Sequence, residues 1–145
     1  MSTTKGVFAI TIHELKRPIM AYGEKCLIGN IQIDDFSEAF NVPVEVWRAV
    51  DYRRQWKEGL ERFLADVFPT CLVAGMRDPL RGVFINIWPV YADRGNAVFQ
   101  NKMLLCKKIR ARFNGHNFYD FIEPRETHTE DGEPISEWVV RRSAI

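Results

Sequence analysis

The sequence predicts a single α+β domain over residues 1–145, in which an antiparallel β-sheet packs against one long amphipathic helix. Three observations lead to this prediction. The chain of 145 residues has the length of one ordinary domain. Apolar residues alternate with a period of two in short segments near both ends of the chain, as they do in half-buried strands. Between residues 44 and 67 the period becomes that of an amphipathic helix.

Two strands are expected before the helix. β-branched residues alternate over residues 7–12 and again over 26–33, and the loop Lys16-Arg17-Pro18 separates the two runs. Asp34 and Asp35 follow the second run, and adjacent acidic residues are typical of a turn or a helix cap. The pattern is also compatible with an additional short helix between Asp35 and Phe40, which we include in the expected fold.

The helix over about residues 44–67 is the best-defined element. Its apolar side chains recur every three or four residues and form one stripe, at Ala49, Tyr52, Trp56, Leu60, Phe63, Leu64 and Val67. Gly59 lies inside the helix at a cost of about 1 kcal/mol relative to alanine, which predicts that another backbone passes close to it. Pro69 is expected to help end the helix.

The apolar period of two returns after the helix. Strands are expected over residues 70–74, 82–91, 97–105 and 135–140. The turn at residues 92–95 joins two of them as a hairpin. Pro89 predicts a bulge or an edge position, because proline removes one ladder donor. Residues 107–112 fit no element clearly, and residues 123–133 are expected to form an acidic loop.

Charge is segregated along a chain that is nearly neutral overall, with a formal net charge of +1. Residues 51–115 contain 12 basic and 6 acidic side chains, whereas residues 116–145 contain 3 basic and 7 acidic ones. The larger acidic group in the C-terminal part is Glu123, Glu126, Glu130, Asp131, Glu133 and Glu137, opposed only by Arg125. A smaller group is Asp34, Asp35 and Glu38. Charge-driven binding is therefore expected to be local.

Patterns typical of catalysis, metal binding and cofactor binding are missing from the sequence. The three histidines are isolated, and no glycine-rich phosphate loop is present. The three cysteines form no CxxC pair and are expected to be buried thiols, at Cys26, Cys71 and Cys106. We therefore expect no enzymatic activity, no metal and no cofactor. An enzyme in which the fold pairs Cys106 with His116 is one rival hypothesis.

A small RNA-binding module is the other rival. Lys107, Lys108, Arg110 and Arg112 lie beside Phe113, which would supply basic contacts and a stacking ring. The same alternation of charges is also typical of a solvated edge strand. Because the net charge gives no general attraction to phosphate, we favour the edge strand and expect no direct nucleic-acid partner.

The start of the chain shows no signal-peptide pattern, and no apolar run approaches the roughly 18 residues of a membrane span. A cytoplasmic protein without a membrane partner is therefore expected. Trp56, Trp88 and Trp138 are expected to pack in the core or on a sheet face. Trp47 and Tyr91 would be interface anchors if exposed beside the acidic loop.

Several segments resemble the immunity proteins of bacterial contact-dependent growth inhibition systems. The resemblance runs from about Ile28 onward and is most specific in DYRRQWKEGL at residues 51–60 and DGEPISEW at residues 131–138. Weaker matches lie at residues 87–91, 99–101 and 124–126. We expect the helix motif to hold the fold, with Trp56 in the core and Tyr52 and Gln55 as buried hydrogen-bonding groups.

The resemblance implies a non-enzymatic cytoplasmic protein that binds, one to one, the C-terminal toxin domain of its cognate cell-surface effector. Many toxins of such systems are nucleases with basic clefts, which an acidic surface can cover. The expected toxin-binding residues are therefore the acidic ones, namely Asp34, Asp35, Glu38, Glu123, Glu126, Glu130, Asp131 and Glu133. Such interfaces are expected to vary between family members, since each inhibitor must discriminate between toxins.

Overall fold

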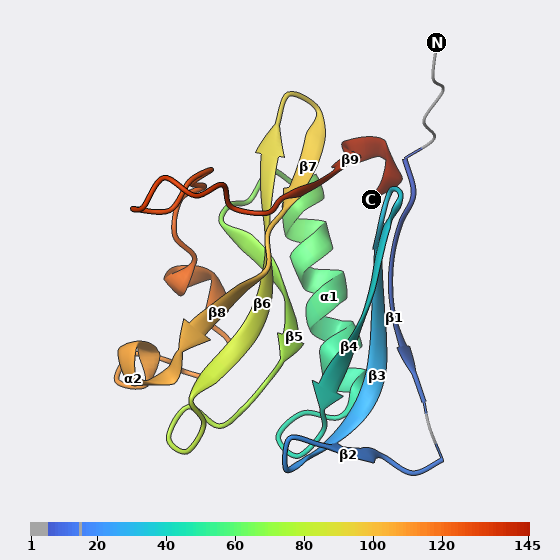
Figure 1. The fold of residues 1–145 in the computed structure, drawn as a ribbon, viewed down its shortest axis with the longest axis vertical. Coiled ribbons are helices and arrows are strands. Elements are labelled where there is room, and N and C mark those ends of the chain that lie inside the picture. Colours follow the sequence, from blue (N-terminus) through green and yellow to red (C-terminus); the bar gives the residue numbers. More distant parts are fainter. Residues whose placement is uncertain (1–5, 15) are drawn as a thin grey trace.

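The computed structural model describes residues 6–14 and 16–145 and contains two antiparallel sheets and one main helix (Figure 1). The α+β prediction is confirmed, with two sheets in place of one. The elements are β1 (Phe8–His13), β2 (Ile19–Ala21), β3 (Glu24–Ile33), β4 (Phe36–Pro43), α1 (Ala49–Leu64), β5 (Thr70–Gly75), β6 (Phe84–Asp93), β7 (Asn96–Phe99), β8 (Lys102–Leu105), α2 (Cys106–Ile109), η1 (Phe118–Phe121), β9 (Trp138–Arg141) and η2 (Arg142–Ala144).

In the first sheet, the long strand β3 pairs with β1 and β2 on one side and with β4 on the other. Ile33 pairs with Phe36, so Asp34 and Asp35 form a tight turn, and Asp34 adopts a left-handed φ of 54°. The expectation of a short helix between Asp35 and Phe40 is wrong. Eight residue pairs join β4 to β3, and this pairing decides the conformation of a segment too short to hold a helix alone.

Helix α1 is shorter than expected, beginning at Ala49 instead of residue 44 and ending at Leu64 instead of residue 67. Arg48 is the N-cap, and its N–H donates to Asp51 Oδ2 at 2.9 Å. Asp66, with a φ of 57°, ends the helix. The buried face is also rotated from the expected stripe and consists of Tyr52, Gln55, Trp56, Gly59 and Phe63, while Leu64 and Val67 are exposed.

The expected close approach at Gly59 is confirmed. A Cβ at this position would collide with the carbonyl oxygen of Cys71 on β5. The Thr70 hydroxyl donates to the Gly59 carbonyl at 2.8 Å across the same contact. α1 therefore lies directly along β5, all six of whose residues are buried.

In the second sheet, β6 pairs with β5 on one side and with both β7 and β8 on the other, and β9 extends the sheet beyond β7. The strand expected over residues 97–105 is two strands, broken at the buried Gln100 and the exposed Asn101. Pro89 lies in β6 opposite this break, so the ladder is interrupted where proline has no N–H to donate. The last strand begins at Trp138, three residues later than expected.

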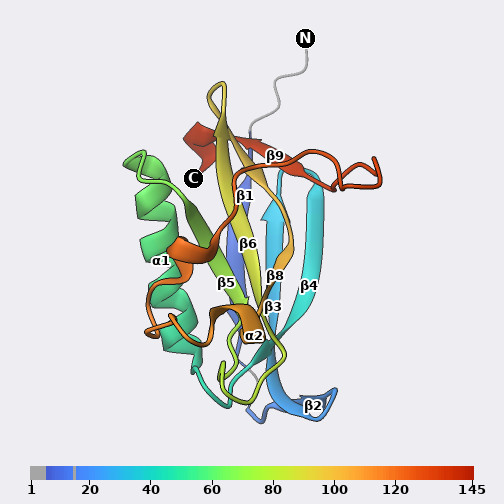
Figure 2. The ribbon, with the colours of Figure 1, turned by 90° about the vertical axis from the view of Figure 1, so that its left-hand side faces the viewer.

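Aromatic rings join the two sheets around one core. Phe8 stacks on Phe99 with a centroid distance of 5.0 Å, and Phe36 stacks on Trp138 at 4.5 Å. Figure 2 shows α1 on one side of both sheets and β9 crossing the end of the molecule where the β3–β4 turn lies. Trp56 and Trp88 are buried as expected, and Trp138 is half-buried against Trp88.

Candidate functional site

The acidic segment expected as a loop is an ordered hairpin, here called the acidic hairpin (residues 123–135). Ile135 N–H donates to the Thr127 carbonyl at 2.9 Å, and Thr129 N–H donates to the Glu133 carbonyl at 2.8 Å. Gly132, with a φ of 80°, closes the tip, and its N–H donates to the Thr129 carbonyl at 2.9 Å. Figures 1 and 2 show this hairpin projecting from the second sheet before the chain enters β9.

The hairpin presents a surface of uncompensated negative charge. Five exposed carboxylates lie on it, those of Glu123, Glu126, Glu130, Asp131 and Glu133. None of them takes part in an ion pair within the part of the chain that the structure describes. A surface of this kind favours association with positively charged groups, and none of its carboxylates would have to leave an internal ion pair among the described residues.

The base of the hairpin is anchored by Arg125. Its guanidinium binds both carboxylate oxygens of Glu137 at 2.8 Å and approaches Asp93 Oδ2 at 3.2 Å. The buried Gln100 side chain donates to Glu137 at 2.8 Å and to the Glu126 carbonyl at 2.9 Å. Glu137 is therefore an internal anchor and not part of the free acidic surface.

The charge of Glu137 is stabilised by these contacts. The Arg125 guanidinium lowers the pKa of Glu137 below its ordinary value, partial burial opposes this shift, and the Gln100 amide adds to it. Glu137 in turn raises the pKa of Arg125. Both groups therefore stay charged at neutral pH, so that the anchor is preserved under physiological conditions.

Gln100 and Asp93 belong to this site, although no sequence pattern indicated them. Gln100 stands between two apolar strand segments, and its burial at 0% exposure is the signal that identifies it in the structure. Asp93 is the last residue of β6 and lies in the turn that the sequence predicts over residues 92–95. Tyr91 lies beside the hairpin as the interface hypothesis required, but it is half-buried and donates to the Glu123 carbonyl at 2.9 Å. Burial, with Glu123 nearby, raises the pKa of Tyr91 to about 12.

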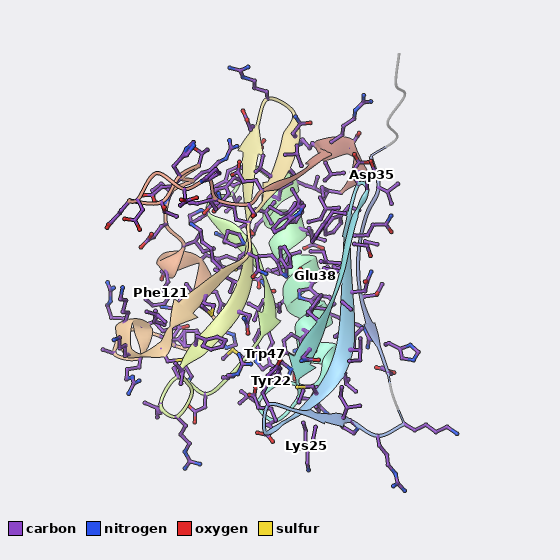
Figure 3. The ribbon with its side chains drawn as sticks, in the orientation of Figure 1. Tyr22, Lys25, Asp35, Glu38, Trp47 and Phe121 are labelled. Atoms are coloured by element: carbon purple, nitrogen blue, oxygen red, sulfur yellow. The ribbon has the colours of Figure 1, made fainter. Side chains whose placement is uncertain are left out.

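The smaller acidic group lies elsewhere. Asp34 is half-buried in the β3–β4 turn, and Asp35 and Glu38 are exposed on the first sheet (Figure 3). Figure 1 shows the acidic hairpin on the opposite side of the molecule from this turn. The structure therefore separates the eight expected contact residues into two acidic surfaces.

Trp47 is not a free anchor. Its half-buried ring packs edge-on against Tyr52 at 5.1 Å and Phe118 at 5.5 Å between ring centroids. The condition under which Trp47 would be an interface anchor, exposure beside the acidic segment, is therefore not met.

The two rival sites are weakened by the geometry. Cys106 is fully buried, and burial raises the pKa of its thiol, whereas His116 is exposed in the turn before η1. No hydrogen bond joins the two among the described residues. Phe113, the proposed stacking ring, is half-buried against Phe118 at 5.0 Å.

The basic segment was expected to be an edge strand, and this expectation is wrong. The segment forms the short helix α2 and the turn that follows it. Its lysine and arginine side chains, which are Lys107, Lys108, Arg110 and Arg112, are exposed. Two buried residues of α2, Cys106 and Ile109, hold this turn against the core.

The helix motif DYRRQW closes the outer edge of β5. Gln55 bridges two β5 residues: its Nε2 donates to the Cys71 carbonyl at 2.8 Å, and its Oε1 accepts from Val73 N–H at 2.7 Å. Trp56 Nε1 donates to the Val73 carbonyl at 2.7 Å, and the Tyr52 hydroxyl donates to the Pro43 carbonyl at 2.6 Å. The expected role of this motif in holding the fold is confirmed.

The closed β5 edge and the anchored acidic hairpin are the two main features of the chain after the first sheet. Residues 42–145, which include both features, match the family model described as the CdiI N-terminal domain. The chain belongs to the CdiI family of contact-dependent growth inhibition immunity proteins. It is 31% identical over 121 residues to a protein named Immunity protein CdiI from Enterobacter cloacae subsp. cloacae, and the match covers 83% of each chain.

A solved structure extends the similarity to the fold. The chain superposes with a TM-score of 0.85 and 28% identity on a chain from the CdiA-CT/CdiI toxin and immunity complex of Enterobacter cloacae, covering 95% of this chain and 92% of that one. The CdiI fold thus extends over nearly the whole chain, including the first sheet, which lies mostly before the family-model match. No described helix is both long and apolar enough to span a membrane. Residues 6–14 and 16–145 also contain no cluster of three or more potential metal ligands.

Proposed function

We propose that this CdiI protein binds the C-terminal toxin domain of its cognate growth-inhibition effector and neutralises it inside the producing cell. It acts by one-to-one binding and not by catalysis. The observation that supports this proposal most directly is the acidic hairpin, which presents five uncompensated carboxylates on an anchored base. An anchored surface loses little conformational freedom on binding, so more of its interaction energy appears as affinity.

The toxin domain is proposed to be a nuclease. A nuclease must attract a polyanionic substrate, so its active-site cleft is expected to be basic. A surface with five carboxylates fits such a cleft, speeds association through long-range attraction and blocks the substrate. Asp34, Asp35 and Glu38 at the β3–β4 turn are proposed as a second contact for the same domain.

Co-expression with the C-terminal domain encoded immediately upstream tests the function. The expected result is rescue of growth together with co-purification of a one-to-one complex. Nuclease activity of the isolated toxin domain is measured on RNA and DNA, with and without a molar equivalent of this protein. Absence of both rescue and complex would contradict the immunity function, whereas rescue from a toxin without nuclease activity would contradict only the proposed toxin class.

Two charge-reversal variants separate the two acidic surfaces. E130K/D131K/E133K reverses three charges on the hairpin, and D35K/E38K reverses two on the first sheet. A loss of affinity in the first variant alone would restrict the interface to the hairpin. If both variants bind the toxin domain with the same affinity as the unsubstituted protein, the proposed contacts are contradicted.

A further inference from the structure

A groove with a volume of about 460 Å³ lies next to the acidic hairpin, between β8 and the residues that follow η1. Its base is apolar, with the buried Ile87, Leu104 and Ile109 below and the half-buried Phe121 and Ile122 on the far wall. Figure 3 shows Phe121 on the same side of the molecule as α2. A space of this size accommodates an apolar side chain together with a short stretch of backbone.

One wall of the groove is basic. Lys102 of β8, Lys108 of α2 and Arg112 of the turn after α2 line it, and Asp120 and Glu123 line the opposite wall. No ion pair closes the groove by joining these walls among the described residues. The Arg112 guanidinium lies over the Phe121 ring, 5.7 Å from its centroid, and this contact leaves the positive charge of the wall available to an acidic side chain of a partner.

The groove also exposes an unpaired strand edge. Among residues 6–14 and 16–145, β8 pairs with β6 alone, and Cys106 N–H donates to the Val83 carbonyl at 2.9 Å. Hydrogen-bonded and non-hydrogen-bonded pairs alternate along an antiparallel ladder. Cys106 belongs to a hydrogen-bonded pair, so Met103, three residues earlier in the same register, belongs to a non-hydrogen-bonded pair. The N–H and C=O of Met103 therefore point away from β6, and Met103 is 57% exposed.

We propose that this groove receives an extended segment of the toxin domain, which adds to the free edge of β8. The segment inserts an apolar side chain over Leu104 and Ile109 and places an acidic side chain against Lys108 and Arg112. Backbone hydrogen bonds from Met103 supply affinity, and the apolar and basic parts of the groove select the sequence of the segment.

This proposal rests on the proposed function and makes it more specific. Glu123 and Pro124 line the groove and also begin the acidic hairpin, so the two surfaces are continuous. The partner must then present a basic surface to the hairpin and an acidic-apolar segment to the groove. A toxin with the opposite arrangement meets like charges in both places, which gives the inhibitor discrimination between toxins.

Charge reversal within α2 tests the basic wall with a matched control. Lys108 lines the groove, and Lys107, which is next to it on the same helix and is also exposed, does not. Binding of each variant to the purified toxin domain is measured by titration calorimetry at roughly 0.15 M salt. We expect Lys108→Glu to weaken binding about tenfold and Lys107→Glu to change it by less than about twofold.

A second pair of variants tests the strand edge. Met103→Ala removes the side chain only, whereas Met103→Pro also removes the outward N–H, a change that an edge strand tolerates. We expect Met103→Pro to bind about fivefold more weakly than Met103→Ala, the effect of about one lost hydrogen bond. Amide exchange of Met103 should also slow when the toxin domain binds.

The outcomes separate the two proposals. Tight toxin binding with equal affinities for Lys107→Glu and Lys108→Glu, and with unchanged exchange at Met103, would overturn the groove while leaving the immunity function intact. No binding by the unsubstituted protein would overturn both. If Met103→Pro fails to fold, the Lys107 and Lys108 pair and the exchange measurement on the parent still decide the question.

Discussion

Two outer strands of the second sheet, β5 and β8, differ in how their edges are covered. The edge of β5 is closed by α1, because Gln55 and Trp56 bind its backbone groups and Gly59 lets the helix approach. The edge of β8 is open and lies in a groove beside the acidic hairpin. An unpaired strand edge favours association with other chains, so a stable protein covers the edges that have no partner. The difference indicates that the helix motif serves the fold and that the β8 side is available for binding.

The largest expected effect is on the closed edge. Trp56→Ala removes a buried indole that packs in the core and hydrogen-bonds to Val73. We expect the free energy of unfolding to fall by about 3 to 5 kcal/mol. Urea denaturation measures this change, and Val50→Ala, on the exposed side of the same helix, is the control, with an expected change within about 0.5 kcal/mol. A Trp56→Ala variant as stable as the control would contradict the assigned packing.

Gln55→Ala opens the same edge without removing an aromatic ring. The Val73 N–H and the Cys71 carbonyl lose their partners while remaining buried. We expect a loss of about 2 to 3 kcal/mol, since an unsatisfied buried group costs more than the net gain of one hydrogen bond. Thermal denaturation measures it. A change as small as that of Val50→Ala would show that water replaces the amide, so that the edge is less closed than the structure indicates.

On the open side, Arg125→Gln releases the base of the acidic hairpin. We expect about 1 to 2 kcal/mol of stability to be lost, because the Arg125–Glu137 contact is bidentate but partly exposed to solvent. Toxin binding should also weaken severalfold as the hairpin becomes less ordered. Slower toxin dissociation in the variant than in the parent would contradict this anchoring role.

The contribution of this anchor depends on pH in a defined direction. Arg125 lowers the pKa of Glu137 below its ordinary value of 4.5, so the stabilisation is fully present above that pH and is lost as the pH falls below it. The stability difference between the parent and Arg125→Gln should therefore shrink in acid. Chemical denaturation at pH 7 and pH 3 measures it, and a difference that grows in acid would contradict the assignment.

The smallest expected effect on stability comes from E130K/D131K/E133K. These exposed side chains form no ion pairs among the described residues, so the melting temperature should change little. Association with the toxin should nevertheless slow about tenfold or more at low salt, and the difference should decrease as salt rises. Stopped-flow association at several salt concentrations measures this. Salt-independent rates would move the interface away from the hairpin.

Local sequence patterns predicted the elements whose conformation they dominate. The amphipathic period predicted α1, the misfit of glycine in its middle predicted the contact with β5, and alternation predicted most strands. Segregated charge along the sequence predicted the acidic segment, because its acidic side chains have few basic neighbours in the chain, and the structure gives its exposed carboxylates no ion pair among the described residues. The helix motif likewise predicted buried hydrogen-bonding groups at Tyr52 and Gln55.

Only the tertiary structure decided which of these residues meet. Residues 36–43 form a strand because they pair with the edge of β3. Gln100 contacts Glu137, the partner of Arg125, because the chain is interrupted between β7 and β8, opposite Pro89. The burial of Cys106 away from His116, the division of the acids into two surfaces, and the open edge of β8 arise in the same way. Each depends on contacts between residues distant in the chain, whose geometry is determined by the packing of the two sheets and not by local preference.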